Sequence, residues 1–372
     1  MDILNTAKSN IRRFTDTLTG VIVPQSVTSP NWHAIITSVR GFSHIRTNLP
    51  NQDAIKCLPE TGIGNRIILS IADGHGSKKY FRSDVGSQLA VETACEVCRN
   101  FLNDYSGKES IEIKNLKFRD IICREIVRKW REKVNVHILN NPFTPDEEAL
   151  IPKKHDDQKN SGVEKIRYRP SEGPEEQSII PYGTTVISVV VTEKFILYLQ
   201  LGDGDILTVL PDGSVSRPLP KDDRLIANET TSLCLPVAWD EFRVRYYPAD
   251  SLFPVMIMVS SDGYSTSFEV VNDFEKVGPD ILNMIIEDPG NIDKGIDLVN
   301  ENLEKWLNET SEKGSGDDIS VGFICNLDKM KKISKKQMVK KAENKKIPPE
   351  TIPEPEKTDF PDNEEHKIDW VI

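Results

Sequence analysis

The chain has 372 residues, of which 38% are hydrophobic and 28% charged, as expected for one large or two medium folded domains. Its formal net charge of −11 disfavours general binding to DNA or RNA, because an acidic surface repels the phosphate backbone. The opening segment lacks the apolar core of a signal peptide, and no stretch approaches the roughly 18 apolar residues of a membrane-spanning helix. The six cysteines form no dense framework. We therefore expect a cytoplasmic protein with reduced thiols that binds neither nucleic acid nor membrane.

The first part of the chain is predicted to be an arm followed by strands. Residues 1–31 end in a linker rich in Pro and Ser, which indicates a loosely attached segment. Folded material is predicted from Trp32, where WHAIITSVRG alternates enough to form a strand. The apolar run RIILSIAD (66–73) ends in Asp-Gly-His-Gly, which predicts a buried strand that enters a tight loop.

Two amphipathic helices and a long loop are predicted next. Apolar side chains recur at helical spacing over residues 91–102 and again over residues 118–134. Cys95-x-x-Cys98 is compatible with a redox or zinc site, but it lies on the apolar stripe and has no partner pair. Core packing is therefore the favoured interpretation. Residues 140–180 are rich in Pro, Lys, Glu and Asp, which predicts a mobile surface loop.

The remainder is predicted to consist mainly of strands, followed by a charged tail. Apolar runs include TTVISVVV, KFILYLQL, DILTVL, PVMIMVSSDG (254–263) and DISVGFIC (318–325), with an amphipathic helix before the last. Residues 327–372 are lysine-rich and then acidic and proline-containing, which predicts a disordered tail. Its closing IDWVI is either a docked or frayed end or a short partner-binding motif.

Three aspartates, Asp73, Asp262 and Asp317, stand at the edges of predicted apolar strands. Hard divalent cations such as Mg²⁺ and Mn²⁺ take oxygen ligands, so a site for them needs only a few carboxylates from different strands. Asp53 and Asp203 are further acids beside strand-like segments. A single Asp-Gly pair is more often a turn than a ligand. The argument for a metal site therefore depends on the joint pattern.

That joint pattern consists of six short motifs in a fixed order. The motifs are NQDA (51–54), IADGHG (71–76), GTT (183–185), LGDGD (201–205), SSDG (260–263) and GDDISV (316–321). Over residues 32–326 the chain resembles the PP2C-type (PPM) metal-dependent serine/threonine phosphatases. Its departures from the usual motifs are typical of a divergent, prokaryotic subgroup.

The resemblance implies an α+β fold: a four-layer αββα sandwich of two mostly antiparallel sheets flanked by helices. It also implies two Mn²⁺ or Mg²⁺ ions at one end of the sandwich. Asp73 would bridge both ions, and the Gly74 carbonyl would bind one of them. Asp262 and Asp317 would complete the other ion. Two close cations lower the pKa of a bridging water, so that hydroxide can attack phosphorus in line at neutral pH.

The resemblance assigns further roles to residues around this site. Asp53 would act partly through bound water, and Asp203 would hold a possible third ion together with Asp262. His75, inside the DGHG loop, would be the general acid for the leaving oxygen; the alternative is an ordinary loop histidine. Arg46 would contact the phosphate, because guanidinium suits bidentate binding of phosphate.

Three positions depart from the usual pattern of the family. Gln52 stands where the family has Glu, so the second ion would bind more weakly. The usual phosphate-binding arginine position is occupied by Asn48. Arg46 reaches the site only if the Leu-Pro insertion brings it into place, and His44 is the alternative anion contact. Asp318 stands where Asn is commonest in the family.

The implied function is hydrolysis of phosphoserine and phosphothreonine in proteins, opposed by a serine/threonine kinase. Three alternatives remain open from the sequence. One is a metallohydrolase for small phosphate esters, and another is a PP2C-like pseudophosphatase that binds a phosphoprotein without cleaving it. The third is a scaffold that acts through its tails.

Overall fold

The computed structural model describes residues 31–106, 117–151, 178–220, 231–248, 253–288 and 290–344, with side chains placed as far as residue 336. The predicted arm up to residue 30, residues 152–177 of the predicted loop and the end of the predicted tail lie outside these ranges. No helix in the described ranges combines the length and the apolar character needed to cross a membrane.

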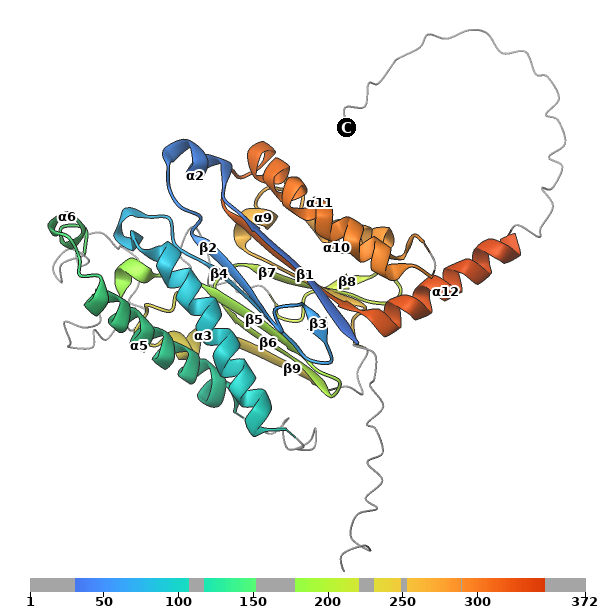
Figure 1. Cartoon of the computed structure of the whole chain (residues 1–372), viewed down its shortest axis with the longest axis horizontal. Helices are drawn as coiled ribbons and strands as arrows, with labels where there is room; N and C mark the ends of the chain where they lie inside the picture. The colour runs from blue at the N-terminus through green and yellow to red at the C-terminus, as the bar shows by residue number, and fades with distance from the viewer. Residues whose placement is uncertain are drawn as a thin grey trace, which may run out of the picture.

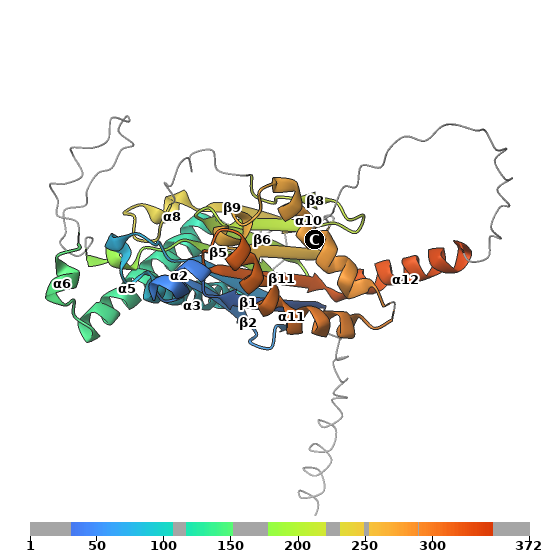
Figure 2. The same cartoon turned by 90° about the horizontal axis from the view of Figure 1, so that it is seen from above.

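Two antiparallel β-sheets lie face to face at the centre of the molecule, with helices outside both (Figure 1, Figure 2). One sheet has the strand order β3-β1-β11-β10-β7-β8, and the other has the order β2-β4-β5-β6-β9. The strands are β1 (Trp32–Val39), β2 (Asp53–Leu58), β3 (Ile63–Gly64), β4 (Ile67–Asp73), β5 (Val186–Val191), β6 (Phe195–Leu201), β7 (Asp205–Val209), β8 (Val215–Ser216), β9 (Arg243–Pro248), β10 (Met256–Ser260) and β11 (Ile319–Asn326).

Helices cover the outer face of each sheet. α3 and α5 pack on the five-stranded sheet, α10 and α11 pack on the six-stranded sheet, and a third apolar cluster fills the space between the sheets. These four layers confirm the predicted αββα sandwich. The helices and helical turns are α2 (Phe42–Thr47), η1 (Lys78–Tyr80), α3 (Ser83–Asp104), η2 (Arg119–Cys123), α5 (Arg124–Asn140), α6 (Pro145–Glu148), η3 (Ile180–Tyr182), α8 (Ala238–Glu241), α9 (Asp262–Ser265), α10 (Val271–Ile286), α11 (Ile292–Lys313) and α12 (Leu327–Asn344).

Strand β4 shows why the central strands are continuous apolar runs. Successive side chains of a strand point to opposite faces, and here both faces are covered. Ile68 and Ala72 pack in the cluster beneath α3. Leu69 and Ile71 pack between the two sheets. The strand ends at Asp73, where the residue is partly exposed but its carboxylate is buried, so the end of the apolar run places a carboxylate at the rim of the core.

The Cys95-x-x-Cys98 pair lies in the core, as the helical stripe predicts. Both thiols are fully buried in α3 and neither forms a disulfide. The Cys95 thiol is 3.4 Å from the Ser70 hydroxyl oxygen, and burial raises the pKa of Cys95 to about 11. These cysteines therefore act as small core side chains.

The prediction of a disordered tail from residue 327 is wrong for its first part, because α12 continues directly from β11. Leu327, Met330 and Ser334 are buried, and Ile333 packs on the cluster formed by α10 and α11. These positions recur every three to four residues and form a narrow apolar stripe between lysines. The overall charge of the segment masks this stripe. Figure 1 shows α12 leaving the domain beyond its docked first turns.

Met330→Ala tests whether this first part of α12 is docked. Met330 is fully buried, so the substitution should lower the free energy of unfolding by about 2–4 kcal/mol through lost burial and a residual cavity. Urea unfolding followed by circular dichroism measures the change. Lys331→Ala, at the exposed neighbouring position, should change stability by less than about 0.5 kcal/mol. Equal stabilities for the two variants would contradict the docking.

Candidate metal centre

Four carboxylates converge where strands of both sheets begin or end. Asp53 begins β2 and pairs directly with Asp73 at the end of the antiparallel strand β4. Asp262 follows β10 by two residues, and Asp317 precedes β11 by two. Because β10 and β11 are antiparallel neighbours, the end of one meets the start of the other. The sandwich thus gathers at one end four side chains that are far apart in the sequence.

These carboxylates act on one another electrostatically. Burial raises the pKa of Asp53 and of Asp73 well above the usual value, and neighbouring carboxylates, including Asp262, raise both further. Partial burial raises the pKa of Asp317 as well, although its side chain is 53% exposed, and Asp262 and Asp318 add to the shift. Clustered negative charge away from water is costly unless a cation compensates it. The donor set, made of hard oxygens in a confined space, suits Mn²⁺ or Mg²⁺.

The loop after β4 is held by the GTT motif. The Thr185 hydroxyl accepts a 3.0 Å hydrogen bond from the Asp73 amide, and the Thr185 amide donates to the Asp73 carbonyl at 2.8 Å. A Cβ at Gly74 would lie 2.6 Å from the Ser83 carbonyl oxygen. Position 74 therefore needs glycine, and the loop presents the Asp73 carboxylate in a fixed orientation.

Gln52 places an unused oxygen atom beside the same loop. Its side chain is 8% exposed, and its amide nitrogen donates to the Ser83 hydroxyl at 2.7 Å. Its Oε1 has no hydrogen-bond partner in the structure. This atom lies beside the loop after β4, because a Cβ added at Gly76 would lie 3.7 Å from it. A buried oxygen without a partner fits a site that receives a hydrated cation.

Asp318 has a structural role that the sequence did not indicate. It is 3% exposed and accepts hydrogen bonds from the Gly41 amide at 2.5 Å and the Gln52 amide at 2.6 Å. His44 Nδ1 lies 2.9 Å from the second of its oxygens. Asp318 thereby joins the start of β11, the start of α2 and the segment that enters β2.

The structure brings His44, rather than Arg46, next to the carboxylates. The His44 side chain is 12% exposed, with Nε2 3.7 Å from Asp317 Oδ1. Arg46 is exposed, and its guanidinium lies over the Phe42 ring, 5.9 Å from the ring centroid. The two residues fall on different sides of α2, so only one of them can point into the site. Phosphate binding by Arg46 stays a prediction.

His75 is packed into the wall of the site. Its amide donates to the Gly183 carbonyl at 3.1 Å, and its ring lies 4.6 Å from the Tyr80 ring, centroid to centroid. Burial, assisted by the charge of Lys79, lowers the pKa of His75 to about 4. The ring is therefore neutral at pH 7, whereas a general acid must carry a proton to donate. The role of His75 as an acid stays a prediction, with this environment against it.

Asp203 is exposed in the turn that precedes β7. Asp205 pairs with Ser260 across β7 and β10, which places this turn beside the Ser261–Asp262 segment. A Cβ at Gly204 would lie 2.6 Å from the Ser260 carbonyl oxygen, so the two backbones are in close contact. Asp203 thus stands at the rim of the site near Asp262, and its binding of a third ion stays a prediction.

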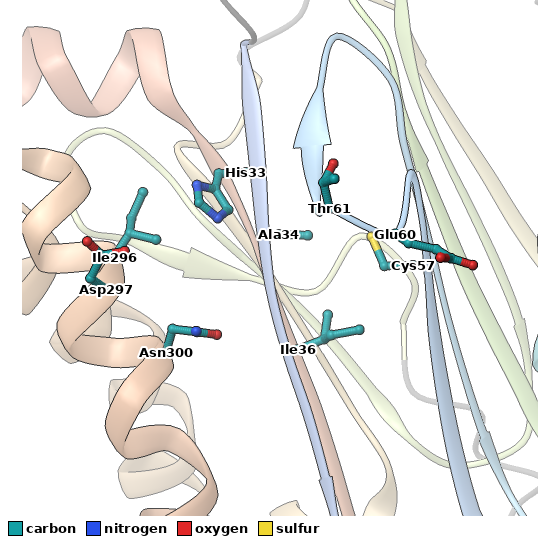
Figure 3. A pocket seen from close by; sticks show the side chains of 10 residues that line it. His33, Ala34, Ile36, Cys57, Glu60, Thr61, Ile296, Asp297 and Asn300 are labelled. Carbon is teal, nitrogen blue, oxygen red and sulfur yellow. The ribbon is translucent and has the colours of Figure 1, made fainter.

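A cavity of about 190 Å³ lies at the opposite end of β1 and β2 (Figure 3). His33 of β1 and Cys57 of β2 line it from the sheets, and Asp297 and Asn300 line it from α11. It shares no residue with the carboxylates, which lie at the other ends of these strands. We assign it no part in the chemistry.

Comparison with known proteins identifies a family. The profile of the protein phosphatase 2C family matches residues 40–308. No curated protein matches the chain. Among solved structures, the catalytic domain of the serine/threonine phosphatase PstP in complex with two manganese ions is 13% identical, with 79% of this chain and 97% of that chain covered and a TM-score of 0.45. The serine/threonine phosphatase of S. agalactiae is 17% identical, with 79% and 99% covered and a TM-score of 0.44.

Proposed function

Because the chain belongs to the protein phosphatase 2C family, we propose that it hydrolyses phosphoserine and phosphothreonine in proteins with the help of two divalent cations. The observation that carries this proposal is the group of four carboxylates at one end of the sandwich, three of which, Asp53, Asp73 and Asp317, have pKa values raised by burial and by neighbouring carboxylates. Such a group has no evident structural use without a cation. The substrate would be a phosphoprotein, and a serine/threonine kinase would oppose the reaction. The cytoplasm is the proposed location, supported by six buried free thiols.

We assign the ligands of Mn²⁺ or Mg²⁺ by position. Asp73 and the Gly74 carbonyl would hold one ion, and Asp73, Asp262 and Asp317 the other. Asp53 is held by the Ser261 hydroxyl, which donates to it at 2.7 Å, and would bind through water. When bound, the two cations make hydroxide available at neutral pH and offset charge on the phosphoryl oxygens.

Three remaining assignments concern the substrate and an additional ion. We propose Asp203 as a ligand of a third, weaker ion because its turn adjoins Asp262. His75 as proton donor and Arg46 as phosphate contact each have a structural argument against them, given above. His75→Asn and Arg46→Ala separate these roles: an acid should affect kcat, and a phosphate contact should affect KM.

The function is tested by hydrolysis of p-nitrophenyl phosphate and of a phosphothreonine peptide, in Mn²⁺, Mg²⁺ or EDTA. Wild type should turn over both substrates only with a cation, and Asp262→Asn should lose this turnover. The ratio of the hydrolysis rates on the two substrates separates a protein phosphatase from a hydrolase of small esters. Deletion of residues 345–372, which follow α12 and leave its docked first turns intact, should leave turnover in place, which a scaffold acting through its tail would not predict.

A catalytically weak pseudophosphatase is the second candidate. It is favoured by Gln52 in place of an acid and by Arg46, which lies over Phe42 rather than at the carboxylates. No turnover at millimolar Mn²⁺ by a folded sample would refute the enzyme and favour this alternative. Binding of the phosphothreonine peptide without cleavage, measured by calorimetry, would then be expected.

A further inference from the structure

We propose that His44 is a nitrogen ligand of the divalent cation at Asp317, and that Asp318 is the carboxylate that orients it. This inference rests on the proposed metal centre. It adds an imidazole to a site for which the sequence motifs indicated only oxygen donors. It also assigns a role to Asp318. Both oxygens of Asp318 already accept hydrogen bonds from backbone amides, so it does not act as a ligand itself.

The hydrogen bonds of His44 fix which of its nitrogens carries the proton. Nδ1 lies 2.9 Å from Asp318 Oδ2 and 3.2 Å from the Pro50 carbonyl oxygen. Both neighbours are acceptors, so Nδ1 must be the donor. In the neutral ring the lone pair is then on Nε2, 3.7 Å from Asp317 Oδ1. A histidine that donates to a carboxylate through one nitrogen and faces a cation with the other is a common arrangement in metal sites.

His44 is held through both its side chain and its backbone. The Gly41 and Gln52 amides hold the Asp318 carboxylate in place, and the Arg40 guanidinium donates to the His44 carbonyl at 3.1 Å. One donor atom from each of His44, Asp317 and Asp318 falls within 4.8 Å of the others. Independently, Gln52, whose backbone amide donates to Asp318, has a buried Oε1 with no hydrogen-bond partner.

An imidazole ligand changes which cation the site prefers. Mg²⁺ favours oxygen ligands and gains little from nitrogen. Mn²⁺ also suits carboxylates, but as a first-row transition metal it gains more from an imidazole than Mg²⁺ does, and the later divalent metals gain more still. The proposal therefore predicts a site selective for Mn²⁺ over Mg²⁺ through a single side chain.

His44→Asn is the discriminating variant. The Asn amide nitrogen can take the place of Nδ1 as donor to Asp318, while the Nε2 lone pair is lost. Mn²⁺ affinity measured by calorimetry should fall about 10- to 100-fold, and Mg²⁺ affinity should change by less than about 3-fold. Ile45→Ala, at an exposed position of the same helix, should change neither. Circular dichroism of metal-free His44→Asn checks that it folds, and His44→Gln provides a second variant that also lacks the imidazole.

A spectroscopic experiment tests the ligand directly. Electron spin echo measurements on Mn²⁺ bound to wild type should show coupling to a ¹⁴N nucleus, and this coupling should be absent in His44→Asn and His44→Gln. Absence of the coupling in wild type would overturn the proposal. Equal losses of Mn²⁺ affinity and Mg²⁺ affinity in both variants would also overturn it. Unchanged cation affinities with weaker inhibition by inorganic phosphate would instead make His44 a phosphate contact. Because these readouts need no turnover, they remain interpretable if the proposed phosphatase activity fails.

Discussion

Replacement of Asp73 by Asn is expected to abolish cation-dependent hydrolysis while making the metal-free protein more stable. Loss of Asp73, the ligand proposed to be shared by two cations, should lower kcat/KM at least about 10³-fold, since such ions contribute several kcal/mol to stabilisation of the transition state. Without cations, Asp73 is a buried carboxylate repelled by Asp53 and Asp262. Removing its charge should raise the free energy of unfolding in EDTA at pH 7, since the raised pKa means that the fold disfavours the charged form.

The same carboxylates should give the metal-free protein a definite dependence on pH. The folded-state pKa values of Asp53 and Asp73 are raised, so folding binds protons. Their contribution to stability is fully present below the unfolded-state pKa of about 4. It is lost as pH rises through the raised folded-state values. In EDTA, wild type should therefore lose more stability between pH 4 and pH 7 than Asp73→Asn does.

Urea unfolding at several pH values, with EDTA or saturating Mn²⁺, measures this difference. Mn²⁺ should remove the loss for wild type, because a bound cation compensates the charge. Asp280→Asn, at an exposed position of α10, should follow wild type throughout. Parallel pH curves for wild type and Asp73→Asn in EDTA would contradict the mutual repulsion of these carboxylates.

The sequence could predict the positions of these aspartates because burial leaves a local signature. The apolar run that ends at Asp73 is continuous because both faces of β4 are covered. The end of that run can be recognised in the sequence alone. The order of the motifs then indicated a joint site. By contrast, Asp318 bonds to Gly41 and Gln52 across 277 and 266 residues. Only the closed sandwich brings those donors together.

Two further features were obscured by neighbouring charge. In α12 the buried positions Leu327 and Met330 stand among lysines, so the composition indicated disorder where a narrow stripe packs. In α2 the choice between Arg46 and His44 depended on which side of a six-residue helix faces the carboxylates. That side is fixed by Asp318, which reaches α2 from the far end of the chain. The spacing of Arg46 and His44 from the NQDA motif could not show which side of the helix that is.

Asp317 and Asp318 are adjacent but should respond to substitution in opposite ways. The Asp317 side chain is 53% exposed, and the Asp318 side chain is 3% exposed. Asp317→Asn should weaken cation binding and activity and leave stability in EDTA unchanged or slightly higher, because its pKa is raised in the fold. Asp318→Asn should instead destabilise the protein by about 2–4 kcal/mol, the scale for breaking buried hydrogen bonds to a charged group.

The reason lies in the three donors that converge on Asp318. The Gly41 amide approaches one oxygen, and the Gln52 amide and His44 Nδ1 approach the other. An amide side chain has only one acceptor oxygen, so in either orientation its NH₂ group faces at least one donor. If Asn turns its NH₂ toward His44, the ring must reverse its protonation or move away. The cation affinity should then fall together with stability.

Comparison of Asp318→Asn, His44→Asn and the double variant separates these two effects. If Asp318 acts on the cation only by orienting His44, the double variant should lose no more Mn²⁺ affinity than His44→Asn alone. Its loss of stability should nevertheless exceed that of His44→Asn, because the Gly41 and Gln52 amides still compete for one oxygen. Additive losses of Mn²⁺ affinity would show that Asp318 acts on the cation independently of the histidine, which the hydrogen bonds of the structure do not predict.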